Sequence, residues 1–191
     1  MIGTDIIDIA ETKKMSNWKR PRFLETLFTL NEQELIQNSE NKFTLVWRLW
    51  SMKEAAYKLY TQIYPSRFYN PKHFQCKIND MCSKVTYKDF ECFVNSKITP
   101  QYIISEARLV HTEMISKCIK LPYNSYKIQS QNTKEALLVF VSEEFKVLKS
   151  KLKIVKSEFG IPSIYHNYKK LNVGISISHH GHYGSFAISS V

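Results

Sequence analysis

The chain has 191 residues, of which 43% are apolar and 13% aromatic, and its formal net charge is +10. This composition supports a core of ordinary size and excludes an intrinsically disordered chain. The apolar runs are far shorter than the roughly 18 residues of a membrane span, and none has the pattern of a secretion signal. We therefore expect a soluble cytoplasmic protein whose positive charge attracts a polyanion, such as a nucleotide cofactor, a nucleic acid or an acidic protein.

The N-terminal third is predicted to form one buried strand followed by helices. Residues 2–9 are short and rich in β-branched side chains, as in a buried strand. Apolar side chains at three- and four-residue spacing predict helices within residues 21–30 and over residues 42–62. Between them, Thr29-x-x-Glu32 has the pattern of a capping box that begins a short helix.

The middle of the chain combines strand and helix patterns. Alternating, aromatic-rich segments predict strands at residues 74–78, 84–94 and 102–110. An amphipathic helix is predicted over residues 133–152, with residue 132 or 133 (Asn132 or Thr133) as its N-cap.

The C-terminal part is predicted to form two hairpins. The first covers residues 154–165 and turns at Gly160-Ile-Pro162, and the second joins residues 173–177 to residues 183–188. Helices combined with mostly antiparallel strands define an α+β fold.

The four cysteines, Cys76, Cys82, Cys92 and Cys118, form no CxxC pair. The spacing of a structural zinc site is therefore absent, and free thiols in a reducing compartment are the favoured interpretation. Only Cys76 and Cys82 are close enough in sequence to suggest a disulfide.

Asp5 is the first candidate for chemistry. It lies inside an apolar strand, and a buried carboxylate is costly unless it is paired, hydrogen-bonded or bound to metal. The simpler interpretation is an aspartate that caps a neighbouring turn. Asp8 points to the opposite face of a regular strand and is not expected to share a site with Asp5.

Glu54 and Lys58 are four residues apart on the long predicted helix and so share one face. A surface ion pair, worth roughly a few tenths of a kcal/mol, is the simpler interpretation. The surrounding segment Trp50-Ser-Met-Lys-Glu-Ala-Ala-Tyr-Lys58 is apolar on several sides, however, and this favours the edge of a cleft.

The segment from Ser176 to His182 contains three histidines in four positions. A zinc site is one interpretation, but neighbouring side chains on a strand diverge. The alternatives are a loop whose Ser178 and His179 side chains hydrogen-bond an anion, and a plain polar turn.

Taken in order, these motifs resemble those of the 4′-phosphopantetheinyl transferase superfamily. The family pattern appears here as Gly3-Thr4-Asp5, Arg22-Phe23, Thr29-x-x-Glu32, Trp50-x-x-Lys53-Glu54-Ala55-x-x-Lys58, Gly160-Ile-Pro162 and Ser176-Ile-Ser178-His179. The resemblance is close over residues 1–60 and 154–191 and weak over about residues 80–150.

Two types within the family are similar to different parts of the chain. The opening strand and the 49-residue interval between Asp5 and Glu54 resemble the holo-acyl-carrier-protein synthase type, a homotrimer with its site between subunits. The Trp-Ser-Met-Lys-Glu sequence resembles that of the surfactin-synthetase-activating type, in which two modules are fused. Members of that type often have a third metal-binding carboxylate at the position where this chain has Ile7.

A second Gly-x-Asp and Lys-Glu set is absent, so we predict one catalytic domain over residues 1–191. It would consist of an antiparallel sheet packed on a long helix, with an inserted strand and helix region at about residues 80–150. By the resemblance it would be a homotrimer, although an insertion that replaces the neighbouring subunit would allow a monomer.

The resemblance implies transfer of the 4′-phosphopantetheine group of coenzyme A to a serine of an acyl or peptidyl carrier protein, as in bacterial fatty acid biosynthesis. It implies that Asp5 and Glu54 bind Mg²⁺ and that Glu54 and Lys58 are catalytic. It further assigns the binding of coenzyme A to Lys53, Lys58, Ser178 and His179. The proton acceptor, Glu54 or a magnesium-bound water, stays open, as does the identity of the carrier.

The resemblance also implies an acidic carrier protein as partner, with neither nucleic acid nor membrane. Docking is expected at the basic residues that follow the first strand, namely Lys13, Lys14, Lys19, Arg20 and Arg22. Two alternatives remain: a basic nucleic-acid-binding protein, suggested by the charge and the aromatic residues, and a non-catalytic family member that binds coenzyme A or a carrier.

Overall fold

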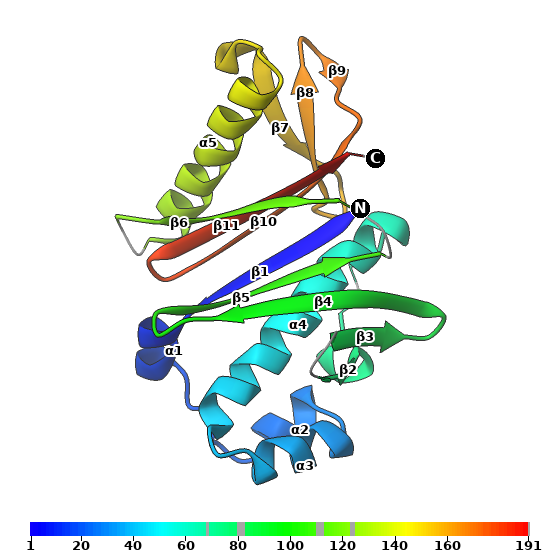
Figure 1. Cartoon of the computed structure of the whole chain (residues 1–191), viewed down its shortest axis with the longest axis vertical. Coiled ribbons are helices and arrows are strands. Elements are labelled where there is room, and N and C mark those ends of the chain that lie inside the picture. Colours follow the sequence, from blue (N-terminus) through cyan, green and yellow to red (C-terminus); the bar gives the residue numbers. More distant parts are fainter. Residues whose placement is uncertain (68, 80–82, 110–112, 123–124, 191) are drawn as a thin grey trace.

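The computed structural model describes residues 1–67, 69–79, 83–109, 113–122 and 125–190. Figure 1 shows two halves stacked along the long axis of the molecule. The helices are α1 (Ile9–Met15), α2 (Phe23–Leu27), α3 (Leu30–Asn38), α4 (Lys42–Ile63) and α5 (Tyr126–Glu144), with 3-10 turns η1 (Pro71–His73) and η2 (Lys149–Lys151). None of the helices described is long and apolar enough to cross a membrane.

The strands form three antiparallel sheets. The first has the order β1-β5-β4-β3-β2, the second β10-β11-β6 and the third β7-β8-β9. Their bounds are β1 (Ile2–Asp8), β2 (Gln75–Lys77), β3 (Ser83–Tyr87), β4 (Phe90–Ile98), β5 (Tyr102–Arg108), β6 (Ile115–Lys120), β7 (Leu152–Lys156), β8 (Pro162–His166), β9 (Lys169–Lys170), β10 (Val173–His180) and β11 (Tyr183–Ser190).

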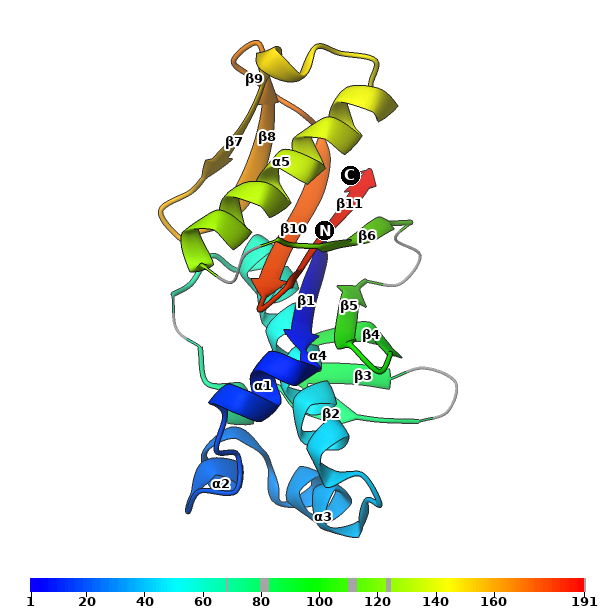
Figure 2. The same ribbon diagram turned by 90° about the vertical axis from the view of Figure 1, so that its left-hand side faces the viewer.

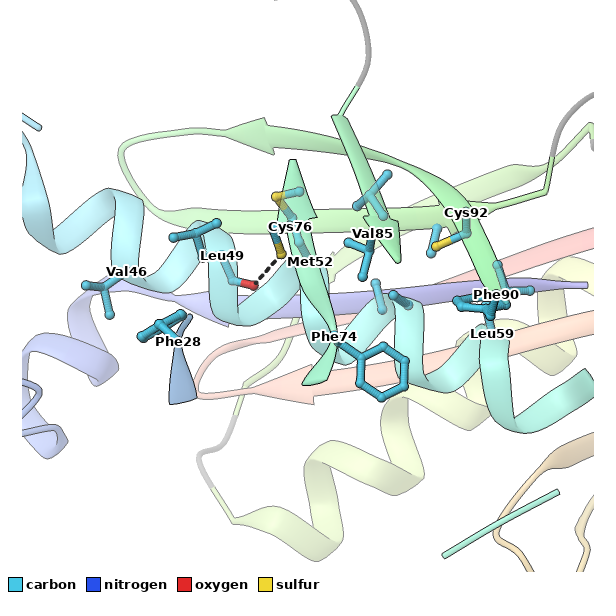
Figure 3. Close-up of a cluster of buried hydrophobic side chains, with 14 of the residues drawn as sticks. Phe28, Val46, Leu49, Met52, Leu59, Phe74, Cys76, Val85, Phe90 and Cys92 are labelled. Carbon is cyan, nitrogen blue, oxygen red and sulfur yellow. Dashed lines mark hydrogen bonds between the residues drawn. The ribbon is translucent and has the colours of Figure 1, made fainter. Parts of the chain in front are cut away.

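The first half packs α4 across the five-stranded sheet. Apolar side chains of α4 at three- and four-residue spacing, including Leu49, Met52 and Leu59, are fully buried against strand residues such as Val85 (Figure 3). Complete burial of such a side chain contributes about 1.5–3 kcal/mol. This apolar contact fixes the position of α4 against β1.

Gly3 allows an unusually close approach of β1 to α4. A Cβ atom at this position would overlap the backbone carbonyl of Ala55. Glycine is therefore required here for steric reasons, and its contact brings Asp5 on β1 toward Glu54 on α4.

The second half has its own apolar cluster between α5 and the remaining strands. Leu137 and Val141 on α5 pack with Ile164 on β8 and with Ile175 and Phe186 on β10 and β11. The two halves meet where β1 lies alongside β10 and β11 (Figures 1 and 2).

The α+β fold is confirmed, as are the long helix α4, the capping box of α3 and both C-terminal hairpins. The capping box is complete, because Thr29 and Glu32 each accept the other's backbone N–H. The antiparallel sheet on a long helix is present in the first half.

Three details of the predicted elements were wrong. Helix α5 begins after Ser125 and ends at Glu144, instead of spanning residues 133–152. The strand predicted over residues 84–94 is the hairpin β3–β4, which turns at Lys88 with a left-handed φ of 51°. Strand β6 was not predicted.

The segment predicted as an insertion divides between the two halves. Strands β3 to β5 complete the first sheet, whereas β6 pairs with β11 and α5 packs on the C-terminal strands. The three described cysteines, Cys76, Cys92 and Cys118, are free thiols. The suggested Cys76–Cys82 disulfide involves a residue outside the described ranges, as does the end of the strand predicted to reach residue 110.

Candidate active site

Asp5 and Glu54 lie together between β1 and α4. Asp5 is nearly buried, and its Oδ1 accepts a hydrogen bond from Lys58 Nζ at 3.0 Å. The same ammonium group donates to the Thr4 carbonyl at 2.9 Å, so Lys58 connects the helix to the strand. Because Glu54 and Lys58 share a face of α4, this ion pair brings Glu54 to Asp5 as well.

The two carboxylates concentrate negative charge in a poorly hydrated site. Burial and then the negative charge of Asp5 raise the pKa of Glu54 to about 7, against the opposing effects of Lys58 and of the Tyr69 hydroxyl. Lys58 alone therefore does not neutralise the pair. An added cation would be stabilised at this position.

The donor set fits Mg²⁺ with ligands from a substrate. Mg²⁺ prefers oxygen ligands and is commonly bound through one or two carboxylates together with substrate phosphates. In the part of the chain that the structure describes, no three His, Cys, Asp or Glu side chains gather into a metal site. Asp5 and Glu54 would thus supply two ligands, and phosphate oxygens and waters the others.

Tyr69 places a buried hydroxyl beside Glu54. This hydroxyl lowers the pKa of Glu54, as a hydrogen-bond donor does, but no described residue hydrogen-bonds it with good geometry. Burial, and then the charge of Glu54, raise the pKa of Tyr69, which keeps it protonated. Its ring stacks on Tyr57 at 4.3 Å between centroids. The protonated hydroxyl therefore lies next to the Glu54 carboxylate, to which it can donate its one proton.

Three basic side chains of the second half, Lys134, Lys156 and His179, lie near Lys58. Their positive charges and that of Lys58 repel one another. Partial burial of its amino group and then the charges of Lys134 and Lys58 lower the pKa of Lys156, although most of its side chain is exposed. Among the described residues, neither Lys134 nor Lys156 has an ion-pair partner. Such a cluster favours binding of an anion.

His179 is the neutral member of this group. Burial and then the charges of Lys58, Lys156 and Lys134 lower the pKa of His179 to about 4. Its Nδ1 lies 3.0 Å from Gln129 Oε1, and its ring contacts that of Tyr126 edge-on at 4.7 Å. Helix α5 therefore fixes the orientation of the imidazole.

A cavity of about 180 Å³ lies next to Lys58 and Lys156. It is enclosed by the C-terminal part of α4, the β7–β8 turn and β10. The lining residues are Tyr57, Lys58, Thr61, Gln62, Lys156, Phe159, Gly160, Ile161, Pro162, Ser176 and Ile177. A larger hollow of about 620 Å³ lies over the outer face of β7–β8, away from the carboxylates. We assign the site to the smaller cavity because it borders both the cations and, through Lys58, the carboxylates.

Ser178 is engaged with Asp5. Its hydroxyl donates to Asp5 Oδ1 at 2.8 Å and accepts the Ile6 N–H at 3.3 Å. The two residues are thus joined across the boundary between the halves.

Lys53 is not brought into the site. Its side chain is fully buried and its ammonium donates to Glu32 at 2.8 Å, to the Pro71 carbonyl at 3.0 Å and to the Phe74 carbonyl at 2.5 Å. All three protons of the ammonium are therefore used within the protein. Its position corresponds to a core residue and not to the coenzyme-binding residue inferred from the sequence.

Asp8 is hydrogen-bonded to the two other histidines of the histidine-rich segment and to the start of α1. Asp8 accepts the Glu11 N–H at the start of α1 and the His182 N–H, while His180 Nδ1 accepts the Asp8 N–H. The capping role considered for Asp5 thus belongs to Asp8. These contacts do not form the zinc site considered for the histidine-rich segment, and the described residues contain no such cluster.

Sequence reasoning missed Tyr69, Lys134 and Lys156. None of them belongs to a recognisable motif, and only the packing of α5 and the β7–β8 hairpin against the first half brings the two lysines near Lys58. The positive excess of the chain was the only signal of such a cluster.

The predicted docking residues lie on an exposed surface around α1 and α2. Lys13, Lys14, Lys19, Arg20 and Arg22 are all exposed. A hollow lined in part by Thr12, Arg20 and Trp47 extends from this surface to His180 at the end of β10.

Comparison with known proteins identifies the family. The sequence model of the 4′-phosphopantetheinyl transferase superfamily matches residues 1–104, more than half of the chain. The protein therefore belongs to the 4′-phosphopantetheinyl transferase superfamily.

One curated relative is a holo-[acyl-carrier-protein] synthase from Caldanaerobacter subterraneus subsp. tengcongensis. It is 36% identical over 58 residues, which make up 30% of this chain and 45% of the relative. The chain thus spans less than half the length of this relative. Lys134, Lys156, Ser178 and His179 lie beyond the residues that the family model matches.

Proposed function

We propose that this protein transfers the 4′-phosphopantetheine group of coenzyme A to a serine of an acyl or peptidyl carrier protein in the presence of Mg²⁺. The observation that carries the proposal is that Lys58 lies next to the carboxylate pair Asp5–Glu54 and also near Lys134 and Lys156, which have no ion-pair partner among the described residues. A metal-bound pyrophosphate and a second phosphate group need such a division of charge.

In this reaction the carrier serine oxygen attacks the β-phosphorus of coenzyme A. A new phosphorus–oxygen bond forms, the bond to the bridging pyrophosphate oxygen breaks, and 3′,5′-ADP leaves with the electron pair. Phosphoryl transfers of this kind depend mainly on positioning and on neutralising charge. When bound, Mg²⁺ would neutralise part of the charge on the pyrophosphate.

The residues divide the work as follows. Asp5 and Glu54 would hold the metal ion, and Lys58 would donate to the pyrophosphate from the same helix face as Glu54. Lys134, Lys156 and His179 bind the 3′-phosphate of coenzyme A. The serine proton passes to Glu54 or to a water beside it.

The carrier docks on the basic surface around α1 and α2. Its expected acidic character complements Lys13, Lys14, Lys19, Arg20 and Arg22, and the hollow beside His180 leads from there to β10. With the carrier docked there, its serine would reach the active site from the side opposite to the 180 Å³ cavity between α4, the β7–β8 turn and β10.

The site draws on both halves of one chain and requires no neighbouring subunit. We therefore propose a single catalytic domain that functions as a monomer. Light scattering should give a mass near 22.5 kDa under assay conditions, and a stable trimer would contradict this part of the proposal.

Glu54→Ala provides the direct test of the activity. Labelling of acyl and peptidyl carrier proteins by a fluorescent coenzyme A should fall by about 100-fold or more, since one of two metal ligands is lost. Glu34→Ala, on the exposed face of α3, is the matched control and should label at the wild-type rate. Full labelling by Glu54→Ala would refute the role of Glu54, whereas coenzyme A binding without turnover by the wild type would indicate a non-catalytic family member.

A further inference from the structure

We propose that Ser178 is a positioning residue that fixes the Asp5 carboxylate for metal binding, and that it does not bind coenzyme A. The inference builds on the proposed function, because it concerns the same metal site. It rests on the hydrogen bonds that join β10 to β1.

Strand β10 satisfies the free edge of β1 with side chains instead of backbone groups. Alternate amides of an antiparallel strand face the same neighbour, and those of Thr4, Ile6 and Asp8 face away from β5. They donate to Ser176 Oγ at 2.9 Å, to Ser178 Oγ at 3.3 Å and to His180 Nδ1 at 3.0 Å. The sequence separation is 172 in each case, so the two strands run parallel side by side (Figure 2).

Only the middle contact reaches a carboxylate. Besides accepting the Ile6 N–H, Ser178 Oγ donates to Asp5 Oδ1 at 2.8 Å. A serine hydroxyl has one proton to donate. Ser178 is also buried, with 7% of its surface exposed. Its proton is committed to Asp5 and is not available to a phosphate.

The two donors to Asp5 converge on one oxygen. Lys58 Nζ and Ser178 Oγ both donate to Oδ1, from α4 and β10 respectively. Among the residues that the structure describes, none donates to Oδ2. Two donors from different elements restrict rotation of the carboxylate and would leave Oδ2 to bind a metal ion, which is the role that outer partners have in metal sites.

Ser176 supplies a matched control for Ser178. Both hydroxyls accept a β1 amide on the same edge, but among the described residues only Ser178 of the two donates a hydrogen bond to Asp5. Ser176 also lines the cavity next to Lys58, so its alanine variant serves as the control for metal requirement and metal affinity, and not for the KM of coenzyme A. In these two properties Ser176→Ala tests the loss of the strand contact, whereas Ser178→Ala removes the strand contact and the support of the carboxylate.

The experiment compares the magnesium dependence of carrier labelling in these two variants. Ser178→Ala should raise the Mg²⁺ concentration for half-maximal labelling by about tenfold, with the KM for coenzyme A nearly unchanged. Ser176→Ala should leave the Mg²⁺ requirement at the wild-type value. Ser178→Thr, which keeps the hydroxyl, should return the Mg²⁺ concentration for half-maximal labelling to the wild-type value.

Direct binding of Mn²⁺, followed by electron paramagnetic resonance, gives a readout that does not need turnover. Mn²⁺ affinity should fall in Ser178→Ala by the same factor and stay unchanged in Ser176→Ala. If Ser178→Ala does not fold, Ser178→Cys, with its weaker donor, carries the same comparison.

Equal metal dependence in the two alanine variants would overturn the assignment. So would a rise in the KM for coenzyme A in Ser178→Ala without a change in metal affinity, because that result would make Ser178 a coenzyme-binding residue. If the wild type labels no carrier, the proposed function fails, while the Mn²⁺ comparison still decides the role of Ser178.

Discussion

Replacing Lys53 by methionine should destabilise the protein strongly without a specific effect on coenzyme A binding. The Lys53–Glu32 pair is 2.8 Å long, and both side chains are essentially inaccessible to water. The substitution keeps the apolar stem but leaves Glu32 without its cation and the Pro71 and Phe74 carbonyls without a donor. Breaking a buried pair in this way costs about 3–5 kcal/mol.

That loss is large against the total stability of a protein of this size, about 5–15 kcal/mol. Urea unfolding followed by circular dichroism should show a midpoint at a clearly lower urea concentration than for the wild type. The double variant Lys53→Met/Glu32→Gln should recover part of the lost stability, because it leaves no unpaired buried charge. The recovery should be incomplete because the Glu32 carboxylate also accepts the Cys76 N–H. Coenzyme A affinity per folded molecule should stay at the wild-type value. A variant with the wild-type urea midpoint but weakened coenzyme binding would refute this reasoning.

Three further predictions concern His179, Lys156 and Gly3. The pKa of His179 is about 4 in the folded protein and 6.5 in the unfolded chain, so the unfolded state binds the proton more readily. The protein should therefore lose stability as the pH falls from about 6.5 to about 4. NMR titration of the His179 ring should give the low pKa, and a normal pKa would contradict this prediction. Lys156→Ala should raise the pKa of His179, since one repelling charge is removed. The same variant should bind coenzyme A more weakly. An unchanged pKa of His179 would show that Lys156 does not face the imidazole ring. Gly3→Ala should cost about 1–3 kcal/mol or more, because its Cβ overlaps the Ala55 carbonyl, and should reduce labelling by separating the carboxylates; wild-type stability in urea would show that the contact is not tight.

The sequence predicted the long helix well because its apolar residues recur at the spacing that the core requires. The start of α5 was missed for the opposite reason. Its first turns present Tyr126 and Ile128 to solvent, 78% and 38% exposed, so that no apolar stripe marks them. The β3–β4 turn was missed because Lys88 adopts a left-handed φ without the glycine or asparagine that normally signals it.

The site was predictable where its residues belong to a motif. Asp5, Glu54 and Lys58 come from two short patterns that resemble those of the family, and the structure brings these residues together. Lys53 belongs to the same pattern but points into the core, because neighbouring positions on a helix face different directions. Tyr69, Lys134 and Lys156 meet the site only through tertiary packing, for which no local pattern exists.

The hydrogen bonds between β1 and β10 join residues 172 or 173 positions apart. Closing so long a loop costs more conformational entropy than any contact within either half, which favours formation of these contacts after those within each half. Each half can assemble its own apolar cluster first. A molecule with both clusters formed but not yet docked would have nearly all its secondary structure and no site, so that recovery of activity should lag behind recovery of the circular dichroism signal during refolding.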